Sequence, residues 1–198
     1  MKKLSTYLFL VLFSFSAPSF ADDISEYQIE GNSIGDSLLD HFSKEEIIKE
    51  LEITKSYYNY LTDEFGEVYL RGNFVNYDTL SFFVKPKDKH YTIYSIYGMI
   101  SYDDKLEECF AKQKEIEKEF SSIYKNAKKR KMTLEFDWDP TGESVTHNIY
   151  FDFDTGDYVR VGCAKYKKSL KIENNWVDNL QVVIGTKEIM KWFANPIN

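Results

Sequence analysis

Apolar and polar residues alternate one by one in several stretches of the chain, and this period is typical of β-strands with one buried face. In the stretch 132–138 the apolar positions are Met132, Leu134, Phe136 and Trp138, whose side chains we expect to help fill a core. Asp154-Thr155-Gly156-Asp157 is typical of a hairpin turn between two such stretches. The pattern predicts strands at residues 79–85, 91–101, 132–138, 145–153, 158–166 and 180–184.

Other stretches follow the helical period. Ser43-Lys44-Glu45-Glu46 is a capping box that opens a helix, after a short helix that runs from its cap Asp36 to Phe42. The longest helix is capped by Asp103 or Asp104 and reaches about Lys128. Thr186 caps a final helix with Ile189, Met190 and Phe193 on its apolar side. The apolar stripe of the longest helix consists of Leu106, Cys109, Phe110, Ile116, Phe120 and Ile123.

The order of these elements predicts an α+β fold in which one antiparallel sheet is packed by helices. Helices precede a group of strands twice, so the order also fits a degenerate tandem α-β-β-β repeat, although the two halves share no visible sequence identity. No segment rich in Pro, Gly or Ser separates the halves. We therefore expect residues 22–198 to form a single α+β domain.

The first 21 residues have the pattern of a signal peptide. Lys2 and Lys3 precede an apolar run at 8–15, and Ser19-Phe20-Ala21 offers small residues at a cleavage site. The run is far shorter than the roughly 20 residues that a membrane span needs. No cysteine follows the cleavage site, which argues against a lipid anchor. We expect cleavage after Ala21, a periplasmic or secreted mature protein, and no integral membrane segment in it.

Cys109 and Cys163 are the two cysteines of the chain. Cys109 lies on the apolar stripe of the longest helix, and Cys163 shares a strand face with Val159 and Val161. Both side chains should therefore point toward the same core, and export favours a disulfide between them. Two buried, unpaired thiols are the alternative. Neither cysteine has a neighbouring histidine or cationic cluster that would make it a catalytic thiol.

Charge argues against several classes of partner. The formal charge of the chain is −7, and removal of Lys2 and Lys3 takes it to −9. Nucleic acids and anionic membranes bind through Lys and Arg, so we expect neither as a partner. A basic run nevertheless follows the longest helix. It could form an anion-binding patch, but we favour the interpretation that its cations complement the negative end of the helix dipole. It consists of Lys125, Lys128, Lys129, Arg130 and Lys131.

Gly35-Asp36-Ser37-Leu38 resembles the block that names the GDSL serine hydrolases. In that family an Asp-x-x-His near the C-terminus supplies the base, and here His147 lacks the aspartate and is the only plausible base for Ser37. The oxyanion-hole block Gly-x-Asn-Asp is missing as well. Asp36 as a helix cap explains the tetrapeptide without any catalysis. We therefore expect no catalytic residues.

Metal sites and a second kind of hydrolase are also disfavoured. Asp154-Thr155-Gly156 matches the triplet of aspartic proteases, but those enzymes need two facing carboxylates and the chain has one copy. Carboxylates gather at the hairpin ends 137–139 and 152–157 without the spacing of an EF-hand. His41, His90 and His147 fit no zinc motif. We expect no metal and no cofactor.

The stretch 29–40, Ile-Glu-Gly-Asn-Ser-Ile-Gly-Asp-Ser-Leu-Leu-Asp, resembles the opening of small exported bacterial proteins without an assigned function, and so does the region around Glu108-Cys109. In outline, residues 31–101 resemble the BamE-type outer-membrane assembly lipoproteins and the β-lactamase-inhibitor proteins, which use such a unit in tandem. The resemblance implies a protein that presents a sheet face or loops to another protein. The chain lacks the lipid-bearing cysteine of the lipoproteins, and no functional residue is carried over.

The sequence thus predicts a non-catalytic binding or adaptor module with an envelope protein as its partner. Its candidate surfaces are the exposed sheet face and the acidic hairpin ends. The alternatives are a serine hydrolase built on Ser37 and a carrier of a small ligand. A hydrolase requires a histidine beside Ser37, and a carrier requires an apolar cavity between the sheet and the longest helix.

Overall fold

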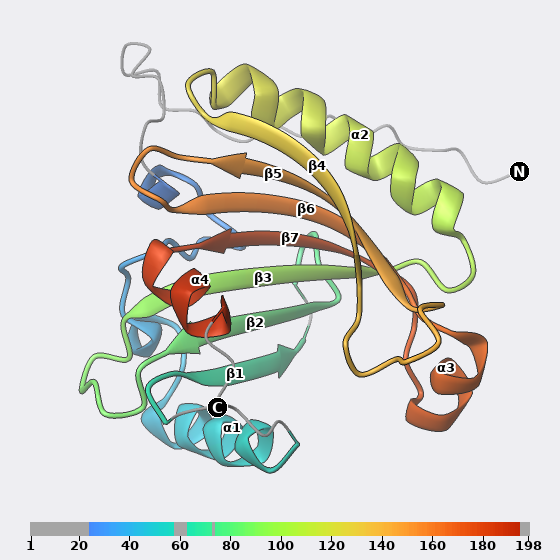
Figure 1. The fold of residues 1–198 in the computed structure, drawn as a ribbon. Helices are drawn as coiled ribbons and strands as arrows, with labels where there is room; N and C mark the ends of the chain where they lie inside the picture. Colours follow the sequence, from blue (N-terminus) through green and yellow to red (C-terminus); the bar gives the residue numbers. More distant parts are fainter. Residues whose placement is uncertain (1–23, 58–62, 73, 195–198) are drawn as a thin grey trace, which may run out of the picture.

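The computed structural model describes residues 24–57, 63–72 and 74–194, so the signal peptide predicted for residues 1–21 lies outside the described residues. The described part of the chain folds into one open antiparallel sheet with helices around it, which is the predicted α+β class (Figure 1). The sheet has seven strands in the order β1-β2-β3-β7-β6-β5-β4. The strands are β1 (Gly66–Arg71), β2 (Thr79–Val84), β3 (Ile93–Ser101), β4 (Lys128–Glu135), β5 (Val145–Asp152), β6 (Tyr158–Lys165) and β7 (Asn179–Gly185).

Strand β7 joins two three-stranded meanders into one sheet. It pairs with β3 on one side and with β6 on the other, both in antiparallel register. A helix precedes each meander, so the predicted α-β-β-β order occurs twice in the described chain. The helices are α1 (Lys44–Tyr57), α2 (Leu106–Ile123), α3 (Lys168–Asn174) and α4 (Lys187–Ala194), with short 3-10 turns η1 (Ile24–Glu26) and η2 (Leu38–Asp40).

The helices cover different parts of the sheet. Helix α1 packs along β1, which is one edge of the sheet, whereas α2 packs on one face against β6 and β7 (Figure 1). Helix α4 lies in front of the opposite face, next to β3 (Figure 1). None of the helices in the described residues is long and apolar enough to span a bilayer.

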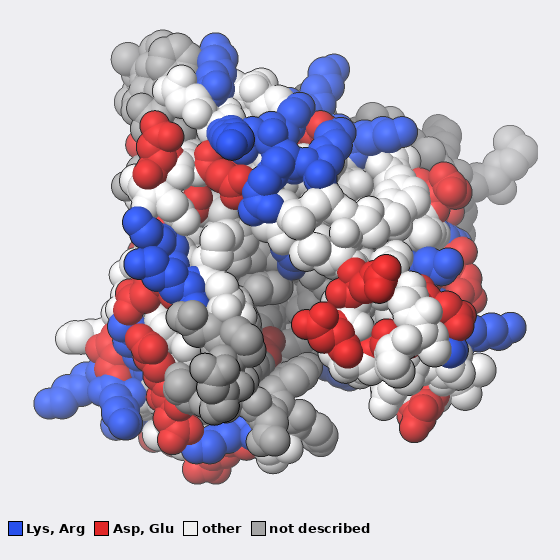
Figure 2. Space-filling view, viewed as in Figure 1, with Lys and Arg blue, Asp and Glu red and all other residues white. Residues whose placement is uncertain are grey.

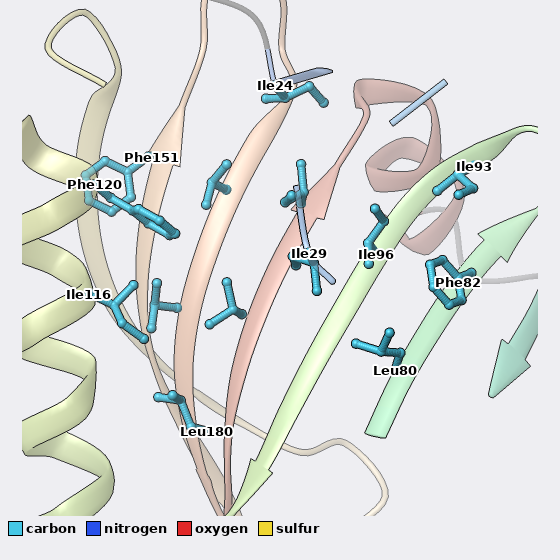
Figure 3. Packing of buried hydrophobic residues seen from close by; sticks show 14 of the residues in the cluster. Ile24, Ile29, Leu80, Phe82, Ile93, Ile96, Ile116, Phe120, Phe151 and Leu180 are labelled. Atoms are coloured by element: carbon cyan, nitrogen blue, oxygen red, sulfur yellow. The ribbon is translucent and has the colours of Figure 1, made fainter. Parts of the chain in front are cut away.

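The main core lies between α2, the N-terminal segment and the α2 side of the sheet (Figure 3). Ile116 and Phe120 of α2 point toward the strands, and the Phe120 and Phe151 rings are in edge contact with centroids 5.8 Å apart. Ile24 and Ile29, which precede the first meander, pack over the middle of the sheet and are buried. Burial of each such side chain contributes about 1.5–3 kcal/mol.

A smaller core holds α4 on the opposite face. Ile189 and Trp192 of this helix pack against Phe83, Tyr158 and Val183 of the sheet. The predicted cap is confirmed, because the Ile189 amide donates to Thr186 Oγ1 at 3.4 Å. Trp192 takes the buried position, and Phe193, which the helical period places on the apolar side, is 41% exposed.

Cys109 and Cys163 meet in the main core, as the sequence predicts. Their sulfur atoms lie at disulfide distance, and their Cα atoms are 6.1 Å apart. Both residues are fully buried. The pair links α2 to β6, two elements that are 54 residues apart along the chain.

The start of α1 is also as predicted. Glu46 accepts hydrogen bonds from the Ser43 amide at 2.9 Å and from the Ser43 hydroxyl at 2.7 Å, and the Glu46 amide donates back to Ser43 Oγ.

The prediction that Asp36 caps a short helix is wrong. Ser37 caps the short η2 turn, while Asp36 accepts from the Ser33 amide at 2.8 Å.

Helix α2 is shorter than the sequence predicts, because it ends at Ile123 and starts after Lys105 without a side-chain cap. Asp104 does not cap it but pairs with Lys171 at 2.6 Å. The basic residues 128–131 belong to strand β4, so they do not complement a helix dipole. Lys129 and Lys131 instead pair with Glu117 of α2. The sequence analysis did not predict β1 or α3. Of the strand predicted at 132–138, only residues 132–135 lie in a strand, β4.

Candidate functional site

Ser37 has a structural role in this fold. Its hydroxyl donates to the carbonyl oxygen of His90 at 2.7 Å and accepts from the Leu39 amide at 3.3 Å. His147 lies on β5, where Nδ1 is 2.9 Å from Thr133 Oγ1 and the ring contacts Phe110 edge-on. Ser37 bridges to Thr92 beside β3, and two strands separate β3 from β5, a distance of about 14 Å. The serine and its only plausible base therefore do not meet.

The acidic hairpin ends are occupied by local hydrogen bonds. Asp157 accepts from the amide of Lys187 at 2.7 Å and so ties the β5–β6 turn to the start of α4. Asp139 accepts from the amides of Thr141 and Ser144 at 3.1 and 2.8 Å. Hydrogen bonds from the side chains of Ser144 and Thr141, with smaller contributions from their amides, hold the pKa of Asp139 well below its ordinary value. Within the described residues no three His, Cys, Asp or Glu side chains come together as metal ligands.

A carrier would need a cavity between α2 and the sheet. That interface is filled by Cys109, Ile116 and Phe120, which are all buried. A pocket of about 450 Å³ lies elsewhere, between α1, β1 and the β2–β3 turn, and is lined by Leu51 and Phe65 among other residues. Among the described residues there is therefore no cavity between α2 and the sheet of the kind that the carrier hypothesis requires.

The second face of the sheet, opposite α2, is a further candidate surface among the described residues. Between α4 and the segment 136–144 it is hollowed, as Figure 2 shows, with Lys and Arg gathered above the hollow over β4. Acidic side chains lie beside it over the segment 136–144 and α3 (Figure 2). We call this surface the hollow face. The register of β3, β7, β6 and β5 places six residues on it, of which Gly162 and Asn148 are buried: Tyr97, Gln181, Arg160, Gly162, Asn148 and Tyr150.

Arg160 lies at the middle of the hollow face and is half-buried. Its Nη1 donates to the Asn148 side-chain oxygen at 2.8 Å, and its Nη2 donates to the Gln181 side-chain oxygen at 2.7 Å. The side chain passes over Gly162, the residue that Asn148 and Gln181 face on either side. Its guanidinium lies 5.8 Å from the centre of the Tyr97 ring. A lone arginine between Val159 and Val161 is the sequence signal that marks this position.

A chain of amide groups leads from Arg160 to one end of the hollow face. Gln181 donates to Asn179 at 3.0 Å, and Asn179 donates to the Tyr166 hydroxyl at 3.4 Å. Each amide points its oxygen toward the arginine, an arrangement in which successive hydrogen bonds polarise one another. The hollow face is therefore a connected polar surface with fixed donor directions.

Aromatic rings gather at the end of that amide chain. The ring of Phe136 stacks on Trp138 and on Tyr166, with centroids 4.8 and 5.5 Å away, and those two rings also contact each other at 6.1 Å. Trp176 meets Trp138 edge-on at 5.0 Å. We call these four residues the aromatic cluster. Trp138 is 48% exposed and Trp176 is 38% exposed. The neighbouring side chains Met132 and Leu134 of β4, which the alternation would bury, are also exposed on this side of the sheet.

Hydrogen bonds of two aspartates, Asp178 and Asp139, fix the backbone that carries the aromatic cluster. Asp178 is buried and accepts from the Tyr166 amide at 2.8 Å and from Lys171 of α3 at 3.1 Å. Asp139, through its bonds to Thr141 and Ser144, fixes the turn that carries Trp138. The rings are thus exposed on a rigid support, which lowers the entropy cost of binding.

Comparison of the chain with protein-family models, with curated proteins and with solved structures gives no match.

Proposed function

We propose that the protein is a non-catalytic binding module that holds a partner protein on the hollow face and the aromatic cluster. The observation that carries this proposal is the exposure of Trp138 and Trp176 on a rigid support. Trp, Tyr, Met and Arg are the residues enriched in the energetic centres of protein interfaces. Burying apolar side chains of this size against a partner would recover stabilisation that they do not provide within this chain.

The shape of the surface favours a protein segment over a small molecule. Sites for small molecules bury about 70–90% of their ligand in a cleft. The hollow face is open toward the viewer in Figure 2, and it continues across the strands from Tyr97 to Tyr150. The hydrolase alternative has less support, because Ser37 is engaged with a backbone carbonyl and His147 lies on another strand.

The compartment is part of the proposal. A signal peptide cleaved after Ala21 would deliver the mature chain to the periplasm or the medium, where a Cys109–Cys163 disulfide is stable. N-terminal sequencing of the protein recovered from those fractions tests this point directly. A mature chain that begins at Asp22 is expected.

Photo-crosslinking tests the binding proposal. A photo-reactive phenylalanine analogue replaces Met132 on the hollow side of β4, and in a control protein it replaces Val75, which is 87% exposed between β1 and β2. Irradiation of cells that export the protein should give one discrete crosslinked species from position 132 and none from position 75. An identical pattern from both positions, or none from either, would contradict the proposal.

A further inference from the structure

Two arginines flank Tyr150 in one cross-strand row of the hollow face, and among the described residues only Arg130 has a carboxylate partner. Arg130 faces Tyr150 on one side and binds the carboxylate of Asp152 through Nε and Nη2. Arg160 faces Tyr150 on the other side and binds the neutral oxygens of Asn148 and Gln181. Within the described residues no carboxylate lies at ion-pair distance from Arg160.

The described residues around Arg160 therefore offer it neutral hydrogen-bond acceptors and no carboxylate. The neighbouring hydroxyl groups cannot supply a negative charge, because burial raises the pKa of Tyr97 well above its ordinary value and also raises that of Tyr158. A guanidinium has five N–H donors, and two of them make hydrogen bonds to the described residues. A half-buried charge in this situation gains free energy from an anionic partner.

The two amide oxygens also fix the direction of the guanidinium plane. Both Nη atoms of Arg160 are held by these bonds, and Nη1 lies so close above Gly162 that a Cβ at that residue would be 3.0 Å away. An arginine that is already oriented loses little entropy when it binds a carboxylate, whose two oxygens match the geometry of the guanidinium.

We propose that Arg160 binds the side-chain carboxylate of an Asp or Glu within an extended, otherwise apolar segment of a partner protein. This inference rests on the proposed function of the hollow face. A side chain is favoured over a chain terminus because the face continues on both sides of Arg160, toward Tyr97 and toward Tyr150. The exposed aromatic cluster and Leu134 offer contacts to apolar residues next to the carboxylate.

The test uses two peptides that differ by one group, acetyl-Phe-Glu-Phe-amide and acetyl-Phe-Gln-Phe-amide. Each is titrated into the mature, oxidised protein at millimolar concentration while the side-chain Nε–H resonance of Arg160 is followed by NMR. The glutamate peptide should bind saturably and about tenfold to a hundredfold more tightly than the glutamine peptide, as expected for a hydrogen-bonded charge. The comparison needs no variant, so it does not depend on the folding of a mutant.

Variants then assign the difference to one residue. Arg160→Gln should bring the two affinities together, whereas Arg71→Gln on the edge strand β1 should leave the difference unchanged. Equal affinities in the wild type, both weakened by Trp138→Ala, would overturn the role of Arg160 and leave the proposed function intact. If neither peptide binds, the carboxylate site is also overturned, and crosslinking from position 132 still decides the proposed function separately.

Discussion

The side chain of Arg160 passes directly over Gly162, and a Cβ atom at residue 162 would lie only 3.0 Å from its Nη1 atom. The same Cβ would lie 2.4 Å from the side-chain oxygen of Asn148. The absence of a side chain at position 162 is therefore what allows the arginine and its two amide partners to lie flat on the sheet.

Replacement of this glycine should disrupt the arrangement. Gly162→Ala is expected to lower the free energy of unfolding by about 1–3 kcal/mol, because side chains must leave their positions in a packed site. Urea denaturation measures the effect. Gly72→Ala serves as the control, since its Cβ would meet the Phe74 ring at an ordinary 3.5 Å. Equal stability of the two variants would show that the Arg160 side chain is not confined at Gly162.

The link between α2 and β6 gives a second prediction. Replacing both Cys109 and Cys163 by serine should lower the free energy of unfolding by about 4 kcal/mol, because the unfolded chain regains the freedom of the loop that the disulfide closes. Denaturation of the wild type with and without a reductant provides the matched comparison. Free thiols in the exported protein, or a stability that the reductant does not change, would argue for two unpaired cysteines.

Ser37 gives a third prediction that separates a structural role from a catalytic one. Ser37→Ala removes the cap of η2 and the hydrogen bond to the His90 carbonyl, so we expect a loss of about 1 kcal/mol in unfolding free energy. A fluorophosphonate probe for active serine hydrolases should not label the wild type. Labelling that disappears in the Ser37→Ala protein would establish the hydrolase alternative.

Asp88 makes stability depend on pH in a defined direction. Hydrogen bonds from Thr92 and from the backbone amides of His90 and Thr92 lower the pKa of Asp88 from 3.8 to about 2. A carboxylate with a lowered pKa stabilises the folded state above its unfolded value and loses this contribution as the pH falls through its folded value. Asp88→Asn should therefore be less stable than the wild type at pH values above about 3.8, and the difference should vanish near pH 2.

Denaturation curves at several pH values measure this difference. Asp154→Asn is a suitable control, because the carboxylate of Asp154 makes no hydrogen bond or ion pair to the described residues. A difference between Asp88→Asn and the wild type that is the same at every pH would mean that the turn does not depend on an ionised Asp88.

The fold class followed from the sequence because alternation reports which residues share a face. Alternation correctly predicted five of the strand regions. The capping residues correctly predicted the start of α1 and the cap at Thr186, and the two apolar faces predicted the meeting of Cys109 with Cys163. Alternation could not tell which face is covered. Met132 and Leu134 alternate as a buried strand would, but β4 is an edge strand and α2 covers its other side.

The hollow face could not be predicted, because its residues come from four strands whose order depends on the whole topology. Arg160 and Gln181 are adjacent only because β7, late in the chain, inserts between β3 and β6. For a similar reason the sequence places the basic run at 125–131 at a helix end, whereas residues 128–131 lie in β4. Its lysines find their partner Glu117 on α2, and no local pattern reveals that contact.

The most direct test of the proposed function measures the affinity of the partner protein that is identified by crosslinking from position 132. The purified partner is titrated into the wild type and into the Trp138→Ala, Trp176→Ala double variant. Both rings are partly exposed at the edge of the fold, so the double variant should still fold, with a loss of stability that thermal unfolding measures beforehand. The account predicts a loss of affinity of at least about thirtyfold, the size expected for truncated aromatic residues at an interface centre. An unchanged affinity would contradict it.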